Sequence, residues 1–176
     1  MDVQEYLEQL SVATRSGAGF LLAYGLTWSI AAVAGWRFGE RAGAWIVLFQ
    51  GTVGLPLGLL LTHVLAEGPR PQDEALGALS LYLAMGQLLV LPLAIVWVAQ
   101  RRHRAATALF AVVLAVHFVP YAWLYSTPLY LGVAAVIATG TAALVAVESE
   151  SSRTAPAVCA LTAAALLVGG GAALTL

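Results

Sequence analysis

Four uncharged polar side chains of this sequence could bind a ligand inside an apolar environment: Gln50, Gln87, His117 and Tyr121. Amide, imidazole and phenol groups all donate and accept hydrogen bonds without carrying a charge. His117 and Tyr121 are four residues apart, which places them on one face of a helix. The apolar stretches around these residues contain no Asp or Glu, which argues against a carboxylate-based proton or sodium relay. We therefore expect a ligand site for a small uncharged or weakly polar solute.

Three prolines accompany these side chains: Pro56, Pro92 and Pro120. A proline inside a helix lacks an N–H group and leaves the carbonyl group four residues earlier without its partner. These carbonyl groups belong to Thr52, Leu88 and Val116. A membrane tolerates such groups where neighbours or a water-lined cavity satisfy them. The pattern predicts a polar pocket, and its alternative is structural, with Gln and His only holding helices together.

Gln50 and Gln87 occupy similar local sequences, since each lies about one and a half turns before a Leu-Pro-Leu segment. Some transporters contain inverted repeats that are visible as weak internal similarity of this kind. A Leu-rich sequence also produces such echoes by chance, and both explanations stay open.

The composition indicates that membrane helices position these groups. Hydrophobic residues make up 61% of the 176 residues and charged residues 10%, against about 25% charged residues in ordinary soluble domains. A helix needs about 20 apolar residues to cross a bilayer. Six stretches meet this need, at about residues 17–36, 43–65, 75–99, 105–124, 129–147 and 155–176. We predict an all-α integral membrane protein, a six-transmembrane-helix bundle that forms a single domain of residues 1–176.

The N-terminal segment, residues 1–15, predicts a short amphipathic helix ahead of the first span. Its apolar residues follow the i, i+3, i+4, i+7 spacing of one helix face: Val3, Tyr6, Leu7 and Leu10. We expect this helix to lie on the membrane surface or against the bundle.

The arginines predict the orientation of the chain. Six of the eight basic residues fall in the loops after the first, third and fifth spans: Arg37, Arg41, Arg101, Arg102, Arg104 and Arg153. The other two, Arg15 and Arg70, fall on the opposite side. Cytoplasmic loops of membrane proteins carry an excess of arginine and lysine. We therefore expect a multi-pass protein of the cell membrane with both termini outside the cytoplasm.

Catalysis and cofactor binding have little support in the sequence. It contains no HExxH or GxSxG motif. The single cysteine, Cys159, excludes an internal disulfide and a thiolate metal cluster. A haem between His63 and His117 would have to overcome an axial offset of about one and a half turns. We expect no catalytic residue, metal or cofactor, and the net charge of −1 gives no reason to expect a nucleic-acid partner.

A second hypothesis treats the chain as a structural or accessory subunit that packs against a partner membrane protein or another copy of itself. Small residues let helices approach closely within a bilayer. The residues of the last two spans that would form this contact face are Gly132, Ala135, Thr139, Gly140, Ala164 and Gly169.

The segment from His117 to Tyr130 contains a His-Phe-x-Pro-Tyr-x-Trp-x-Tyr pattern. This pattern resembles the signature of a family of uncharacterised prokaryotic membrane proteins, the domain-of-unknown-function 7010 family. Other similar places are Gly19-Phe-Leu-Leu-Ala with Trp28, the Leu-Pro-Leu segment around Pro56, and Gln87 with the segment around Pro92. The resemblance covers about residues 12–135 and implies a membrane fold without an assigned activity.

Overall fold

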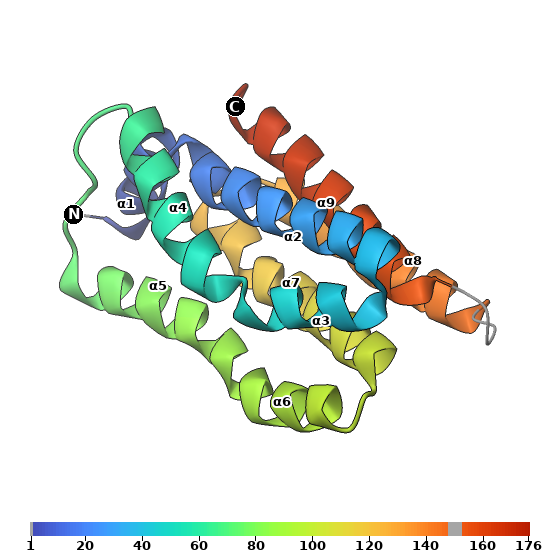
Figure 1. Cartoon of the computed structure of the whole chain (residues 1–176). Coiled ribbons are helices and arrows are strands. Elements are labelled where there is room, and N and C mark those ends of the chain that lie inside the picture. The colour runs from blue at the N-terminus through green and yellow to red at the C-terminus, as the bar shows by residue number, and fades with distance from the viewer. Residues whose placement is uncertain (1, 148–152) are drawn as a thin grey trace.

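The structure of the chain is a computed structural model, which describes residues 2–147 and 153–176. Every regular element in these two ranges is a helix, so the all-α prediction is confirmed (Figure 1). The elements are α1 (Val3–Ala13), η1 (Arg15–Gly17), α2 (Ala18–Phe38), α3 (Glu40–Phe49), α4 (Gly51–Leu65), α5 (Glu74–Gly86), η2 (Gln87–Val90), α6 (Leu91–Ala99), α7 (His103–Leu124), α8 (Leu129–Ala146) and α9 (Thr154–Ala173). The loop predicted after the fifth span lies mostly outside the described residues.

Five helical segments are long and apolar enough to cross a membrane: Arg15–Phe38, Glu74–Ala99, His103–Leu124, Leu129–Ala146 and Thr154–Ala173. The stretch predicted as the second span, residues 43–65, is divided between two helices, α3 and α4, which meet at a bend of 53°. The described residues therefore contain five candidate spans, or six if the bent pair counts as one.

Helix α2 packs on α3, α4 and α9, and Figure 1 shows it between α4 and α9. Glycines allow these close approaches, since a Cβ atom on Gly25 would lie 2.8 Å from Leu167 of α9. The indole of Trp28 is fully buried at the centre of the same core, together with Leu21 and Leu166. Close backbone approach through small residues is the usual way in which membrane helices associate.

Helix α1 contributes Tyr6, Leu7 and Leu10 to this main core. It is followed by three consecutive residues with positive φ, namely Arg15 (50°), Ser16 (47°) and Gly17 (74°). This left-handed segment turns the chain from α1 into α2, which places α1 against the bundle. The relation of α1 to a membrane surface stays a prediction.

The segment α5–η2–α6 is much less buried than α2. Only Ala94 and Val98 are buried between residues 74 and 99, and the segment packs mainly on α7 and α3. It forms the lower edge of the bundle in Figure 1, and α5 does not pack on α4 although the 66–73 loop connects them.

Two glycines of the proposed partner face are used inside the bundle, so that part of the second hypothesis is wrong. A Cβ atom on Gly140 would lie 2.4 Å from the side chain of Leu161, and one on Gly169 would lie 2.7 Å from Val133. Both positions therefore belong to the packing of α8 on α9. The other small residues of that face are exposed: Gly132, Ala135, Thr139 and Ala164.

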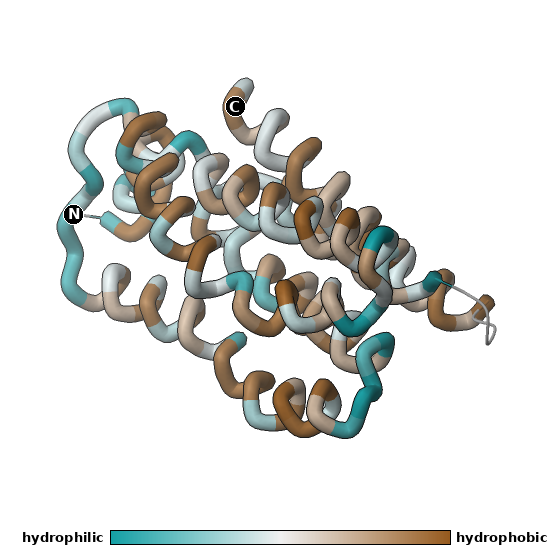
Figure 2. The backbone as a smooth tube through the Cα atoms, in the orientation of Figure 1, coloured by the Kyte–Doolittle hydropathy of each residue, from teal (hydrophilic) through white to brown (hydrophobic). Residues whose placement is uncertain are grey.

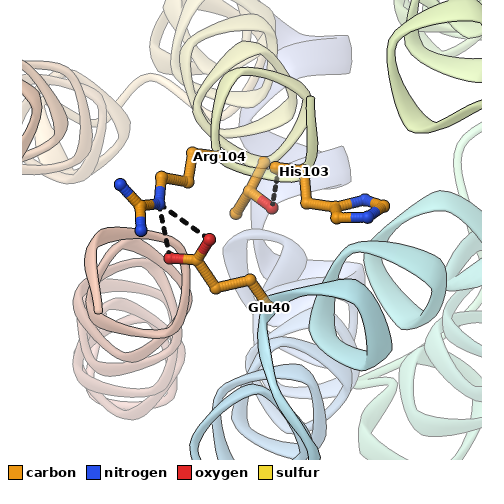
Figure 3. Close-up of polar contacts among 4 residues, drawn as sticks. Glu40, His103 and Arg104 are labelled. Carbon is orange, nitrogen blue, oxygen red and sulfur yellow. Dashed lines mark hydrogen bonds and ion pairs between the residues drawn. The ribbon is translucent and has the colours of Figure 1, made fainter. Parts of the chain in front are cut away.

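Ion pairs mark the two ends of the bundle, where hydrophilic residues gather in Figure 2. At one end, which we call the arginine end, Arg104 Nε donates to both carboxylate oxygens of Glu40, at 2.8 and 2.7 Å (Figure 3). At the other end Arg15 pairs with Glu67, and its guanidinium also donates to the carbonyl oxygen of Leu174 at 3.4 Å. The apolar helices extend between these two polar ends.

We expect Glu40→Gln to lower the free energy of unfolding by about 1–2 kcal/mol, because the partly buried Arg104 guanidinium loses the negative charge of the Glu40 carboxylate. Thermal unfolding of the detergent-purified protein measures the effect. Glu67→Gln is the matched control, since its ion pair is more exposed (49% against 23% for the carboxylate side chain). Equal effects of the two substitutions would contradict the expectation.

Candidate functional site

A cavity of about 330 Å³ lies between α2, the α3–α4 bend, the α5–η2–α6 segment and α7. This volume is at the lower end of the roughly 300–1,000 Å³ typical of small-molecule pockets. The side chains and glycine that line it are Tyr24, Val47, Leu48, Phe49, Gln50, Gly51, Thr52, Gln87, Leu88, Val90, Leu91, Ile95, Phe110, Val113 and Leu114. The cavity therefore combines two of the four predicted site residues with mostly apolar walls.

Both glutamines stand where a helix is interrupted. Gln50 is the residue between α3 and α4, at the 53° bend. Gln87 begins η2, the short 3₁₀ turn between α5 and α6. Interruptions of this kind at membrane depth are tolerated where they line a cavity. Here both of them line the same one.

The prolines help to explain these interruptions. Pro56 and Pro92 each deprive a carbonyl group of its helical donor, and the residues that carry those groups, Thr52 and Leu88, both line the cavity. The third such residue, Val116, is 65% exposed and lies outside it. Two of the three prolines thus act at the cavity.

Gln50 is oriented by α2. The single hydroxyl proton of Thr27 is shared between the carboxamide Oε1 of Gln50, at 3.1 Å, and the carbonyl oxygen of Tyr24, at 2.9 Å. The backbone carbonyl of Gln50 accepts from the amide of Gly54 at 2.6 Å. These contacts fix the main chain at the bend and leave the Nε2 group of Gln50 available to donate into the cavity.

Gln87 approaches the cavity from the opposite wall. Its side chain is half-buried, and within the described residues it forms no hydrogen bond. It is thirteen residues from the start of α5 and twelve from the end of α6, which is about 18–20 Å along the helix axis from either end. An amide at such depth without a protein partner is a group that a ligand can satisfy.

His117 and Tyr121 are next to each other, as predicted from their spacing, but neither lines this cavity. Their ring centroids are 4.8 Å apart. The α7 side of the cavity ends at Leu114, three residues before His117. The imidazole interacts instead with the backbone of Leu83 on α5. The structure thus divides the four predicted site residues into a glutamine pair and a histidine–tyrosine pair.

The histidine–tyrosine pair belongs to an aromatic cluster that also contains Phe118, Tyr125 and Tyr130, with neighbouring centroids 4.8–6.2 Å apart. The hydroxyl of Tyr130 donates to the carbonyl oxygen of Ser16 at 2.6 Å. Burial raises the pKa of Tyr125 above its usual value, and a hydrogen bond with Thr14 opposes part of that rise. Tyr125 therefore stays neutral. The bond from Tyr130 to Ser16 connects the cluster to the left-handed turn before α2 and stabilises that turn.

Tyr130→Phe is expected to lower the free energy of unfolding by about 1–2 kcal/mol, because it leaves the buried Ser16 carbonyl without a donor. Thermal unfolding in detergent provides the measurement. Tyr82→Phe serves as the control, since Tyr82 is 70% exposed on α5 and should not change stability. A Tyr130→Phe variant as stable as the parent chain would show that this bond contributes nothing.

Sequence reasoning missed two groups of this site. Tyr24 and Thr27 are three residues apart on α2, so they share a helix face. Tyr24 lines the cavity, and Thr27 forms a hydrogen bond with Gln50. Phe110 and Val113 on α7 have the same spacing and supply its apolar wall. Polar spacing could have indicated the first pair, whereas apolar residues in a membrane helix carry no signal of which side they face.

No curated protein and no solved structure matches the chain. The resemblance predicted from the segment around His117 is confirmed, because a match to a known family extends over nearly the whole chain. The chain belongs to the family of unknown function DUF7010, which matches residues 3–171.

Proposed function

We propose that the chain is a six-span membrane protein, one transmembrane domain of residues 1–176, that binds or transports a small uncharged solute in the cavity between its two interrupted helices. In this proposal α3 and α4 together form the second span. The arginine end faces the cytoplasm, because it carries most of the arginines, and both termini lie outside. The observation that carries the proposal is the presence of Gln50 and Gln87, each at a helix interruption, in the walls of one cavity.

The chemistry of the walls supports an uncharged solute. Tyr24, Gln50, Thr52 and Gln87 are the polar residues among those that line the cavity, and none of the lining residues is Asp, Glu, Lys, Arg or His. A charged ligand would lose its hydration there without meeting an opposite charge, which is costly in a medium of low polarity. The amides can instead satisfy one or two hydrogen-bonding groups of a neutral molecule.

His117 and Tyr121 have a different part in this proposal. They were predicted as ligand-binding residues. The interaction of His117 with the backbone of Leu83 on α5, and the ring contact between His117 and Tyr121, support a role next to the cavity and outside its walls. We propose that they fix α5 on α7, so that their substitution alters the cavity only through the position of α5.

A thermal-shift screen in detergent tests the proposal. A solute that binds the folded protein raises its unfolding temperature, by an amount equivalent to about 2.7 kcal/mol at a concentration of 100 Kd. We expect uncharged solutes to produce such shifts and Val113→Trp to abolish them, because the indole would fill the cavity.

Val112→Trp is the matched control, since Val112 is 41% exposed on the outer side of α7 and lies outside the cavity. This variant should keep the shifts of the parent chain. The proposal fails if no uncharged solute stabilises the protein, or if Val113→Trp responds to the solutes as Val112→Trp does.

The subunit hypothesis retains one supporting observation, the exposed small residues Gly132, Ala135 and Thr139 on α8. They lie at i, i+3 and i+7 and so share one helix face. Crosslinking in native membranes distinguishes this second function, which a monomer without a crosslinked partner would exclude.

A further inference from the structure

The cavity is closed toward the arginine end. Ala44, Val98 and Ala106 form a small buried cluster there, with Leu48 and Trp97 packed against it. The ion pair between Glu40 and Arg104 covers the same end (Figure 3). Leu48 also lines the cavity, so this cluster separates the cavity from the water at that end.

The cavity is open on its side. Several of the residues that line it are also exposed on the outer surface, among them Phe49 at 56%, Leu88 at 50% and Ile95 at 53%. Gly51 and Thr52, in the first turn of α4, are exposed as well. We call the gap between these two residues and Leu88 of η2 the mouth. It lies on the side where α4 and α5 do not pack on each other.

The mouth is surrounded by apolar side chains that point outward. Val53 and Leu55 of α4 and Met85 and Leu89 of the opposite wall are all more than half exposed, the last of them at 84%. Such residues near the middle of apolar helices contact lipid chains and not water. A ligand that arrives through the mouth therefore comes from the hydrocarbon part of the bilayer.

The two amide side chains in the walls of the cavity, those of Gln50 and Gln87, select the head of this ligand. Gln50 uses Oε1 on Thr27 and keeps its N–H groups for the cavity, while Gln87 offers both a donor and an acceptor. An uncharged carbonyl group accepts from such donors, and a primary carboxamide can also donate to the oxygen of Gln87. The other walls are mostly apolar, with residues such as Phe110 and Leu114, and fit the first carbons of an apolar chain next to the head.

We infer that the ligand is a membrane-soluble molecule, an apolar chain with an uncharged carbonyl head, which enters sideways through the mouth and places its head between Gln50 and Gln87. This inference rests on the proposed function and deepens it, since it assigns the solute to the lipids of the bilayer and not to the aqueous phase. The chain of the ligand extends through the mouth, between Thr52 and Leu88, into the surrounding lipid.

Three matched probes test this inference with the full chain reconstituted in phosphatidylcholine nanodiscs: oleamide, oleate at pH 9, and acetamide. Oleamide has both the chain and the uncharged head, oleate replaces the head by a charged one, and acetamide has the head alone. We expect oleamide to raise the unfolding temperature, and oleate and acetamide to bind at least about tenfold more weakly. Val113→Trp should abolish the oleamide shift and Val112→Trp should keep it.

A second pair of variants tests the lateral route. Thr52→Trp narrows the mouth and should weaken oleamide binding, whereas Val53→Trp adds the same side chain on the adjacent exposed position, which does not line the cavity. Equal binding by these two variants would overturn the route through the mouth.

The remaining outcomes separate this inference from the proposed function. A shift with acetamide as large as with oleamide, lost in Val113→Trp, would overturn the lipid-soluble ligand and support the proposed binding function. If oleate binds as tightly as oleamide, the assignment of an uncharged head is overturned. An oleamide shift that survives in Val113→Trp, or no shift with oleamide, would overturn the inference, while the screen of water-soluble solutes would still decide the proposed function.

Discussion

Gly19→Ala is expected to lower the free energy of unfolding by about 3 kcal/mol, at the upper end of the usual cost of overpacking. A Cβ atom on Gly19 would lie 2.5 Å from the backbone nitrogen of Thr62 and 2.9 Å from the carbonyl carbon of Leu61. These are main-chain atoms of α4, so no side-chain rotation relieves the contact. The substitution must push α4 away from α2, and α4 has few other helices to hold it.

Thermal unfolding and the monodisperse yield after detergent extraction measure this effect. Gly77→Ala is the matched control, because a Cβ atom on Gly77 of α5 meets nothing within 4 Å. Alanine has the higher helix propensity, by about 1 kcal/mol in water, so this control should be as stable as the parent chain or more stable. If Gly19→Ala melts with the parent chain, the close packing of α2 on α4 is not what stabilises this side of the bundle.

The double substitution Gln50→Leu and Gln87→Leu is expected to weaken ligand binding by at least about a hundredfold, since each lost hydrogen bond to a buried ligand group costs about 1–3 kcal/mol. The loss should come without unfolding. Thr27 keeps its bond to the carbonyl oxygen of Tyr24 when the Gln50 amide is removed. The side chain of Gln87 has no hydrogen-bond partner in the described part of the chain, so its replacement breaks no side-chain bond.

Binding is measured with the best compound of the thermal-shift screen, for the two single variants and the double variant. Gln100→Leu provides the control, because Gln100 is exposed after α6 and does not line the cavity. A double variant that binds as tightly as the parent chain would exclude the amides from the site. A double variant that fails to fold would show that the glutamines hold the helices together, which is the structural alternative.

The sequence was informative where a residue type can occupy only one part of a membrane protein at a low cost in free energy. Its apolar composition and the spacing of prolines and charges were enough to predict an all-helical chain with membrane-like helices. The two segments in which a glutamine precedes Leu-Pro-Leu both coincide with helix interruptions around the cavity. The family resemblance of the segment around His117 pointed in the same direction, toward a membrane fold.

Only the tertiary structure decided which face of each helix meets its neighbours. Successive residues of a helix point about 100° apart, so each helix presents several faces. Lipid is as apolar as the side chains of a helix interface. Hydrophobic periodicity therefore does not distinguish the helix face that packs inside the bundle from the face that contacts lipid. For this reason the sequence grouped His117 with Gln87, whereas packing turns His117 toward Leu83 and the aromatic cluster. The bend at Gln50 also depends on packing, because Thr27 comes from another helix.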